Sequence, residues 1–87
     1  MKQTTDLNSN LIVRTKLKKV NDVYILPPGY ILNETGVKVI EYCDGRHSVK
    51  DIIMLISREY NERPTVVKKD VMKFIKRLLF LSALKVV

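Results

Sequence analysis

Cys43 is the single cysteine of this 87-residue chain, so no disulfide bond can form within it. A chain of this length makes one small hydrophobic core and leaves little room for a deep internal cavity. Its one histidine, His47, is too few to build a zinc site from cysteine and histidine ligands. We therefore expect a domain that is not an enzyme and needs no metal or cofactor of its own, in a reducing, cytoplasmic setting.

The N-terminal segment has no apolar block. Residues 1–10 therefore suggest a flexible tail and not a signal peptide, and we expect a single domain over residues 11–87. No stretch of the chain has the roughly 18 uninterrupted apolar residues that a membrane span requires.

Positive charge is concentrated at the two ends of the sequence. The net charge is +7, and the segment from Pro64 to Val87 has six basic residues against one acidic residue. The middle of the chain, residues 34–63, is nearly neutral. If the fold brings the two ends together, they form a positive face that attracts an anionic partner. A lysine-rich surface with no binding role is the simpler alternative.

The first third of the chain has the pattern of a three-stranded antiparallel sheet. Residues 13–17 alternate apolar or small side chains with basic ones, which predicts a first strand with one buried face. Asn21-Asp22 is a turn pair, and residues 23–26 form a second strand that stops at Pro27-Pro28-Gly29. Residues 30–32 form the third strand.

Helix signals fill the rest of the chain. Asn33 suits an N-cap, Ser48 with Asp51 resembles a capping box, and Thr65 can cap a helix after the break at Pro64. The expected helices span residues 34–43, about 49–61 and 66–81. Three strands followed by three helices predict an α+β fold.

The third helix has a core face and a basic flank. Met72 and Leu79 lie beside lysines on the flank of this helix, where a partner could bind. Phe80 points away from the core face, so it either packs on residues 83–87 or belongs to an interface. The apolar stripe that faces the core is Val67, Val71, Phe74, Ile75 and Leu78.

Four segments, taken in order, resemble the PqqD-like family over roughly residues 13–86: Tyr30 to Gly36, Cys43-Asp44-Gly45, Val49 to Ile52, and Asp70-Val71. Ser82-Ala83-Leu84 stands where the family usually has a glycine.

This resemblance implies a winged helix-turn-helix domain that acts as a RiPP recognition element, that is, a recognition domain for ribosomally synthesised and post-translationally modified peptides. Such a domain binds the leader segment of a precursor peptide as an added strand on the third strand, against the third helix. It presents the leader to a modifying enzyme, such as a radical-SAM protein or a leader peptidase. Catalysis, and any redox cofactor, belong to that enzyme.

The residues themselves favour the same mechanism. An exposed edge strand offers unpaired backbone groups to an extended peptide, and lysines along a groove suit an acidic leader. Met72 and Leu79 can supply an adaptable apolar floor. The sequence leaves open which flank of the third helix faces the strand. The candidate peptide-binding residues are Tyr30, Ile31, Leu32, Asn33, Lys68, Lys69, Met72, Lys73, Lys76 and Leu79.

Other functions stay open. A basic third helix after a helix and a turn is also the layout of a nucleic-acid-binding winged helix, although this helix has no Asn or Gln for reading bases. A generic adaptor or a toxin–antitoxin-like module is a further alternative. For an enzyme the best candidates are Cys43 and His47. Cys43 lies at an apolar helix position, which better fits a buried thiol, and His47 lies in a turn, which better fits a solvated imidazole. The precursor, the enzyme served, and the choice between a monomer and a weak homodimer are not predicted.

Overall fold

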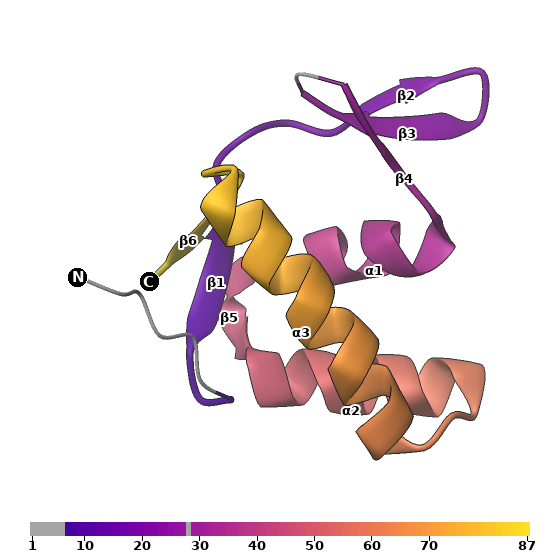
Figure 1. Cartoon of the computed structure of the whole chain (residues 1–87), viewed down its shortest axis with the longest axis vertical. Coiled ribbons are helices and arrows are strands. Elements are labelled where there is room, and N and C mark those ends of the chain that lie inside the picture. The colour runs from indigo at the N-terminus through magenta and orange to yellow at the C-terminus, as the bar shows by residue number, and fades with distance from the viewer. Residues whose placement is uncertain (1–6, 28) are drawn as a thin grey trace.

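A computed structural model describes residues 7–27 and 29–87 of the chain (Figure 1). The described part is α+β, with three helices and two three-stranded antiparallel sheets, which confirms the predicted class. The elements are β1 (Asn10–Val13), β2 (Lys18–Val20), β3 (Val23–Leu26), β4 (Tyr30–Leu32), α1 (Glu34–Tyr42), β5 (Asp44–Ser48), α2 (Val49–Tyr60), α3 (Pro64–Phe80) and β6 (Leu84–Val86).

One sheet has the order β2-β3-β4 and projects beyond the helices in Figure 1. Asn21 and Asp22 join β2 to β3, and both have positive φ angles, 49° and 67°. Two left-handed residues make the turn whose twist matches that of an antiparallel hairpin. The predicted strands at residues 23–26 and 30–32 are therefore confirmed.

The predicted first strand over residues 13–17 is wrong. Its alternating burial is present, with half-buried Val13, Thr15 and Leu17 between exposed basic residues, but residues 14–17 pair with no strand in the described chain. This segment crosses from one sheet to the other: the Arg14 N–H donates to the Ala83 carbonyl, and β2 begins only at Lys18.

The second sheet, in the order β5-β1-β6, was not predicted. It joins the two ends of the described chain, because β1 pairs with β6 from Leu11 to Val13 and the Val87 N–H donates to the Asn10 carbonyl at 2.9 Å. Leu7 accepts a hydrogen bond from the Lys50 N–H at 2.9 Å. The flexible tail was predicted for residues 1–10; residues 1–6 lie outside the described part, and Leu7 and Asn10 make the contacts just given.

The caps of the first two helices are as predicted. Asn33 caps α1, with the Gly36 N–H donating to Asn33 Oδ1 at 2.8 Å. At the start of α2, the Ser48 and Asp51 side chains each accept from the other residue's backbone N–H at 3.1 Å, which completes a capping box. These caps satisfy N–H groups that a helix end leaves unpaired.

The predicted cap of the third helix at Thr65 is wrong. α3 begins at Pro64, and its N-cap is Arg63, whose side chain makes no capping hydrogen bond. Proline suits the first helical position because its φ angle is already helical and its missing N–H would be unpaired there anyway. Pro64 therefore starts the helix that it was expected to precede.

The core is built around α3. Val67, Val71, Ile75 and Leu78 are buried as predicted, whereas Phe74, expected in the same stripe, is only half-buried. Phe80 is 87% exposed, so it does not pack on residues 83–87, and the interface alternative remains. No helix in residues 7–27 and 29–87 combines the length and the apolar character needed to cross a membrane.

Because Arg63 leaves the first turn of α3 without a side-chain cap, we predict that Arg63→Ser stabilises the protein by about 1 kcal/mol relative to Arg63→Ala. The serine hydroxyl can accept from a free N–H of that turn, and alanine cannot. Urea denaturation of the two variants measures the difference. Equal free energies of unfolding would contradict this account of the α3 start.

Candidate functional site

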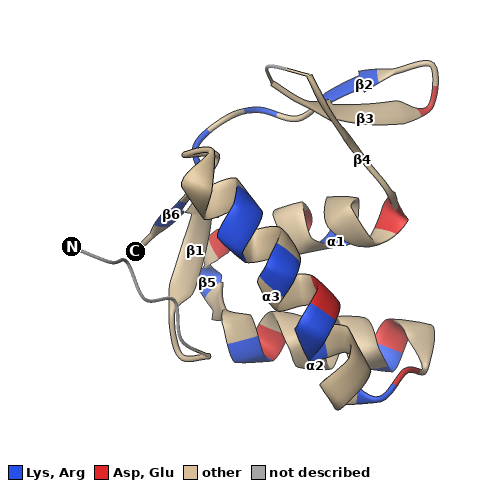
Figure 2. Cartoon of the chain, viewed as in Figure 1, with Lys and Arg blue, Asp and Glu red and all other residues tan. Residues whose placement is uncertain are grey.

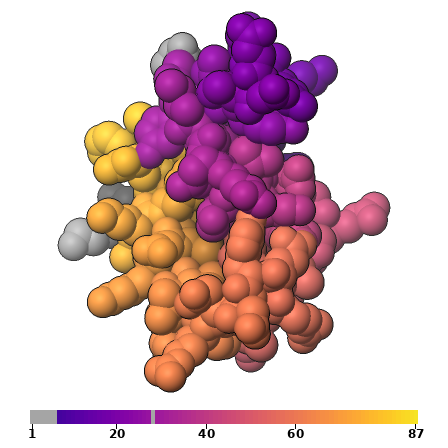
Figure 3. Space-filling model, turned by 90° about the vertical axis from the view of Figure 1, so that its right-hand side faces the viewer, coloured from indigo at the N-terminus to yellow at the C-terminus, as the bar shows by residue number. Residues whose placement is uncertain are grey.

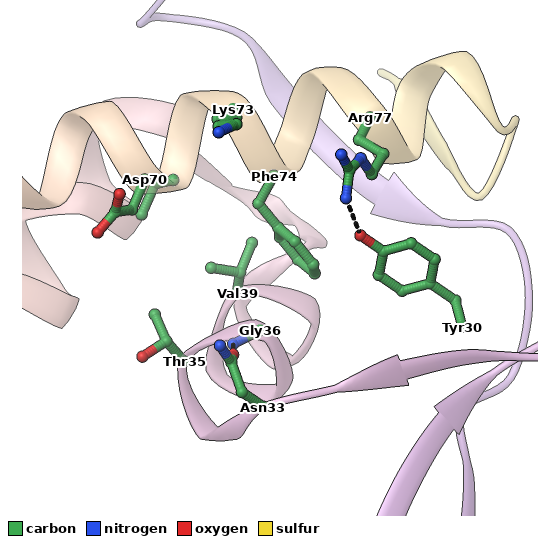
Figure 4. Close-up of a pocket in the computed structure, with 10 residues that line it drawn as sticks. Tyr30, Asn33, Thr35, Gly36, Val39, Asp70, Lys73, Phe74 and Arg77 are labelled. Carbon is green, nitrogen blue, oxygen red and sulfur yellow. Dashed lines mark hydrogen bonds between the residues drawn. The ribbon is translucent and has the colours of Figure 1, made fainter.

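A pocket of about 400 Å³ lies between β4, the first turns of α1 and the middle of α3 (Figure 4). We call it the β4–α3 groove. Tyr30 comes from β4, and Asn33 stands at the junction of β4 with α1. The remaining lining residues are Thr35, Gly36 and Val39 from α1, and Asp70, Val71, Lys73, Phe74 and Arg77 from α3.

β4 is an edge strand of its sheet, and the strand pairing fixes which of its backbone N–H and C=O groups point to the free side. Val20 and Val23 flank the two-residue turn, so they form a hydrogen-bonded pair. Such pairs recur at every second position, so the N–H and C=O groups of Ile25 also point toward β2. Ile25 faces Ile31 of β4. Because hydrogen-bonded and non-hydrogen-bonded pairs alternate, the N–H and C=O groups of Ile31 point away from β3. Among the described residues no strand pairs with that side of β4.

Tyr30 and Arg77 bridge β4 and α3 at one end of the groove. Arg77 Nη1 donates to Tyr30 Oη at 2.8 Å, and the guanidinium carbon lies 6.0 Å from the centre of the tyrosine ring. The hydrogen bond that Arg77 donates to this hydroxyl raises the pKa of Arg77, so the guanidinium stays charged. Figure 4 shows both side chains reaching toward each other across the space between the two elements.

Phe74 and Gly36 set the depth of the groove. A Cβ atom at Gly36 would lie 3.2 Å from Phe74 Cζ and 3.2 Å from Asn33 Oδ1. Contacts this short are tighter than ordinary van der Waals packing. The absence of a side chain at Gly36 therefore lets the Phe74 ring approach the first turn of α1, as Figure 4 shows.

The charges of the groove are separated along α3. Lys73 and Arg77 lie toward the Tyr30 end, whereas Asp70 lies one turn earlier. None of the ion pairs found among residues 7–27 and 29–87 includes any of these three side chains. The two cations are thus available to an acidic ligand.

The structure places the predicted strand residues in different surroundings. Tyr30 and Asn33 line the groove, while Leu32 is buried in the core and is 7% exposed. Ile31, on the opposite side of the strand from Leu32 and Tyr30, is 69% exposed.

Of the predicted α3 residues, only Lys73 lines the groove. Leu79 is half-buried against the core. The others lie along a separate hollow that also includes Lys73 and that we call the outer lysine face; Figure 2 shows the basic residues recurring along α3. The predicted residues on this face are Lys68, Lys69, Met72, Lys73 and Lys76.

Four residues on the α3 side of the groove were not among the predicted binding residues, and one of them, Val71, is a buried residue of the predicted core stripe. Phe74 was assigned to the core stripe, and Asp70 was noted only as part of the family resemblance. Arg77, the single arginine of α3, was not among the candidate peptide-binding residues. The spacing of residues 70, 73, 74 and 77 places all four on one side of a helix, which was the available signal.

Cys43 and His47 do not form a nucleophile and base. Cys43 is 2% exposed, and burial raises the pKa of its thiol to about 12. His47 Nδ1 instead lies 3.0 Å from Asp44 Oδ1. The hydrogen bond from the Arg46 backbone and the contact with His47 lower the pKa of the Asp44 carboxyl.

We predict that Cys43 in the folded protein does not react with a thiol reagent such as DTNB at pH 8, because a pKa of about 12 leaves almost no thiolate. In urea the thiol has an ordinary pKa and reacts at once. Rapid reaction without urea would contradict this burial.

A thiol whose pKa is raised in the folded state stabilises the fold at pH values below its unfolded pKa. The free energy of unfolding should therefore fall above about pH 9, and fall less in Cys43→Val.

Comparison with known families agrees with this arrangement. A family model described as Coenzyme PQQ synthesis protein D (PqqD) matches residues 23–79, more than half of the chain. The match runs from β3 to the last turn of α3 and contains every residue that lines the groove. No curated protein and no solved structure matches the chain. The chain therefore belongs to the PqqD family, whose members have an accessory, peptide-binding role in the biosynthesis of PQQ and other RiPPs.

Proposed function

We propose that this protein binds the leader segment of a precursor peptide as an added strand on the free edge of β4. The leader's side chains enter the β4–α3 groove, and the protein presents the leader to a modifying enzyme such as a radical-SAM protein or a leader peptidase. In this winged-helix layout the β2–β3 hairpin is the wing and α3 is the helix beside the peptide. The observation that carries the proposal is that the free edge of β4 borders a groove in a member of the PqqD family.

The two edges of this sheet differ in a way that supports β4 as the binding edge. β2, the opposite edge, is exposed along its length and carries Lys18 and Lys19, and charged edge residues discourage strand pairing. β4 carries no charged residue, and its outward backbone groups at Ile31 can exchange two hydrogen bonds with an extended peptide.

The charge of α3 supports an acidic leader. Lys73 and Arg77 can contact carboxylates within the groove, and the outer lysine face attracts an acidic peptide from a distance. Catalysis and redox chemistry belong to the partner enzyme. The unpaired, buried Cys43 suits a cytoplasmic setting, and the protein acts there as a monomer or weak homodimer.

Nucleic-acid binding is the second candidate, and the outer lysine face is the observation that favours it. Lysines spaced along an exposed helix can contact phosphates without reading sequence. A DNA duplex tested beside the peptide separates the two functions, since phosphate contacts weaken steeply as salt rises. Binding of the duplex alone would replace the peptide proposal.

Ile31→Pro tests strand addition directly. We predict that it weakens binding of the leader peptide encoded near the protein's gene by about tenfold or more, because proline removes the N–H that points to the free edge. The β3–β4 ladder does not use that N–H, so the variant should fold. Fluorescence anisotropy with a labelled leader measures the affinity.

Ile31→Thr is the matched control, because it changes the same exposed side chain but keeps the N–H. It should bind within about twofold of the wild type. Equal affinities for Ile31→Pro and Ile31→Thr, with both variants folded by circular dichroism, would remove the β4 edge from the binding site.

Lys73 and Lys69 separate contact within the groove from long-range attraction. We predict that Lys73→Gln both slows association with an acidic leader and speeds its dissociation, since Lys73 lines the groove. Lys69→Gln, on the outer lysine face, should slow association only. Stopped-flow measurements at two salt concentrations report both rates. Identical effects of the two substitutions would argue against a specific contact at Lys73.

A further inference from the structure

A second pocket, of about 410 Å³, adjoins the β4–α3 groove. It lies between the first turn of α1, the C-terminal end of α2 and the N-terminal half of α3, and we call it the α2–α3 pocket. Figure 3 shows this face, where the magenta side chains of the β4–α1 segment meet the orange side chains of α2 and α3. Thr35, Asp70 and Val71 line both pockets, so the two pockets are adjacent along α3, and together we call them the depression.

The α2–α3 pocket is apolar at its base and partly apolar at its rim. Ile56, Val67 and Val71 are 2%, 7% and 1% exposed and form the base. Val66 and Tyr60 at the rim are 49% and 37% exposed. An apolar side chain placed between them would bury its own surface and theirs, which is the main source of affinity in such a subsite.

The charges at the two ends of the depression are opposite. Asp70 and Glu62 line the α2–α3 pocket, and burial, together with the neighbouring Glu34 carboxylate, raises the pKa of Tyr60. The cationic side chains of Lys73 and Arg77 lie at the other end. An acidic side chain is therefore attracted to the β4 end and repelled from the α2–α3 pocket.

We infer that the α2–α3 pocket is a second subsite for the same peptide and takes an apolar, uncharged side chain. This inference rests on the proposed function. A peptide paired with β4 runs past Asn33, where β4 ends and α1 begins, and the shared residues Thr35 and Asp70 lie next along the depression. An extended peptide advances about 3.3 Å per residue, so the anchor lies a few residues from the strand-forming segment. The preferred peptide combines an acidic residue for Lys73 and Arg77 with an apolar anchor on one side of it.

The test uses peptides selected from a random 12-residue phage library against the full chain, resynthesised with a fluorescent label. Val66→Asp places a charge at the rim of the α2–α3 pocket, and it is the third residue of α3, where an acidic residue favours the helix. Val20→Asp is the matched control, because Val20 is 50% exposed and lies on β2, away from the depression.

If the inference holds, Val66→Asp lowers affinity by about tenfold or more while Val20→Asp stays within about twofold. An alanine scan of the peptide then finds one apolar residue whose loss matters in the wild type and not in Val66→Asp. Unchanged affinity in Val66→Asp, with Ile31→Pro still weakening binding, overturns the second subsite and leaves strand addition in place. Peptides that bind all three variants like the wild type, or no selected peptide at all, overturn both proposals.

Discussion

The ring of Phe74 lies against the first turn of α1 at Gly36, and the position of α3 beside β4 depends on this contact. Any side chain at Gly36 would meet both the ring and the Asn33 carboxamide that caps α1. The same few atoms therefore end β4, start α1 and set how closely α3 approaches. The β4–α3 groove exists because these three elements converge at Gly36, which has no side chain, and the hydrogen bond between Arg77 and Tyr30 closes one end of it.

Local signals predicted most of the fold, and long-range pairing accounts for the sheet that they missed. The caps at Asn33 and Ser48 and the turn at Asn21-Asp22 depend on neighbours in sequence, so the residues alone identified them. The β5-β1-β6 sheet pairs segments from both ends of the chain. β5, with the sequence DGRHS, has neither apolar alternation nor β-branched residues, and β6 is only three residues long. Neither strand could be predicted without knowing its partner.

For the binding site too, local patterns predicted one part, and the tertiary arrangement decided the rest. The sequence predicted the third strand as a binding edge, and β4 does lie at the edge of its sheet. Because a strand alternates its faces, Leu32 is buried where its neighbour Ile31 is exposed. A helical wheel orders the sides of α3 relative to one another but does not say which neighbour covers each side. The predicted lysine flank therefore became the outer lysine face, and the flank with Phe74 and Arg77 lies toward β4. Lys73 lies between the two and belongs to both.

The shortness of β4 has a kinetic consequence. Only Ile31 presents both backbone groups to the free edge, so backbone pairing of the proposed kind would contribute about 1–3 kcal/mol from two hydrogen bonds. Such an increment is too small to hold a peptide for long, whatever its sequence. The residence time of a peptide would then be set by its side chains in the depression along α3. A peptide whose anchors fit poorly would dissociate faster than one whose anchors fit well. A short edge thus suits the proposed role, in which each peptide is handed over before the next one binds.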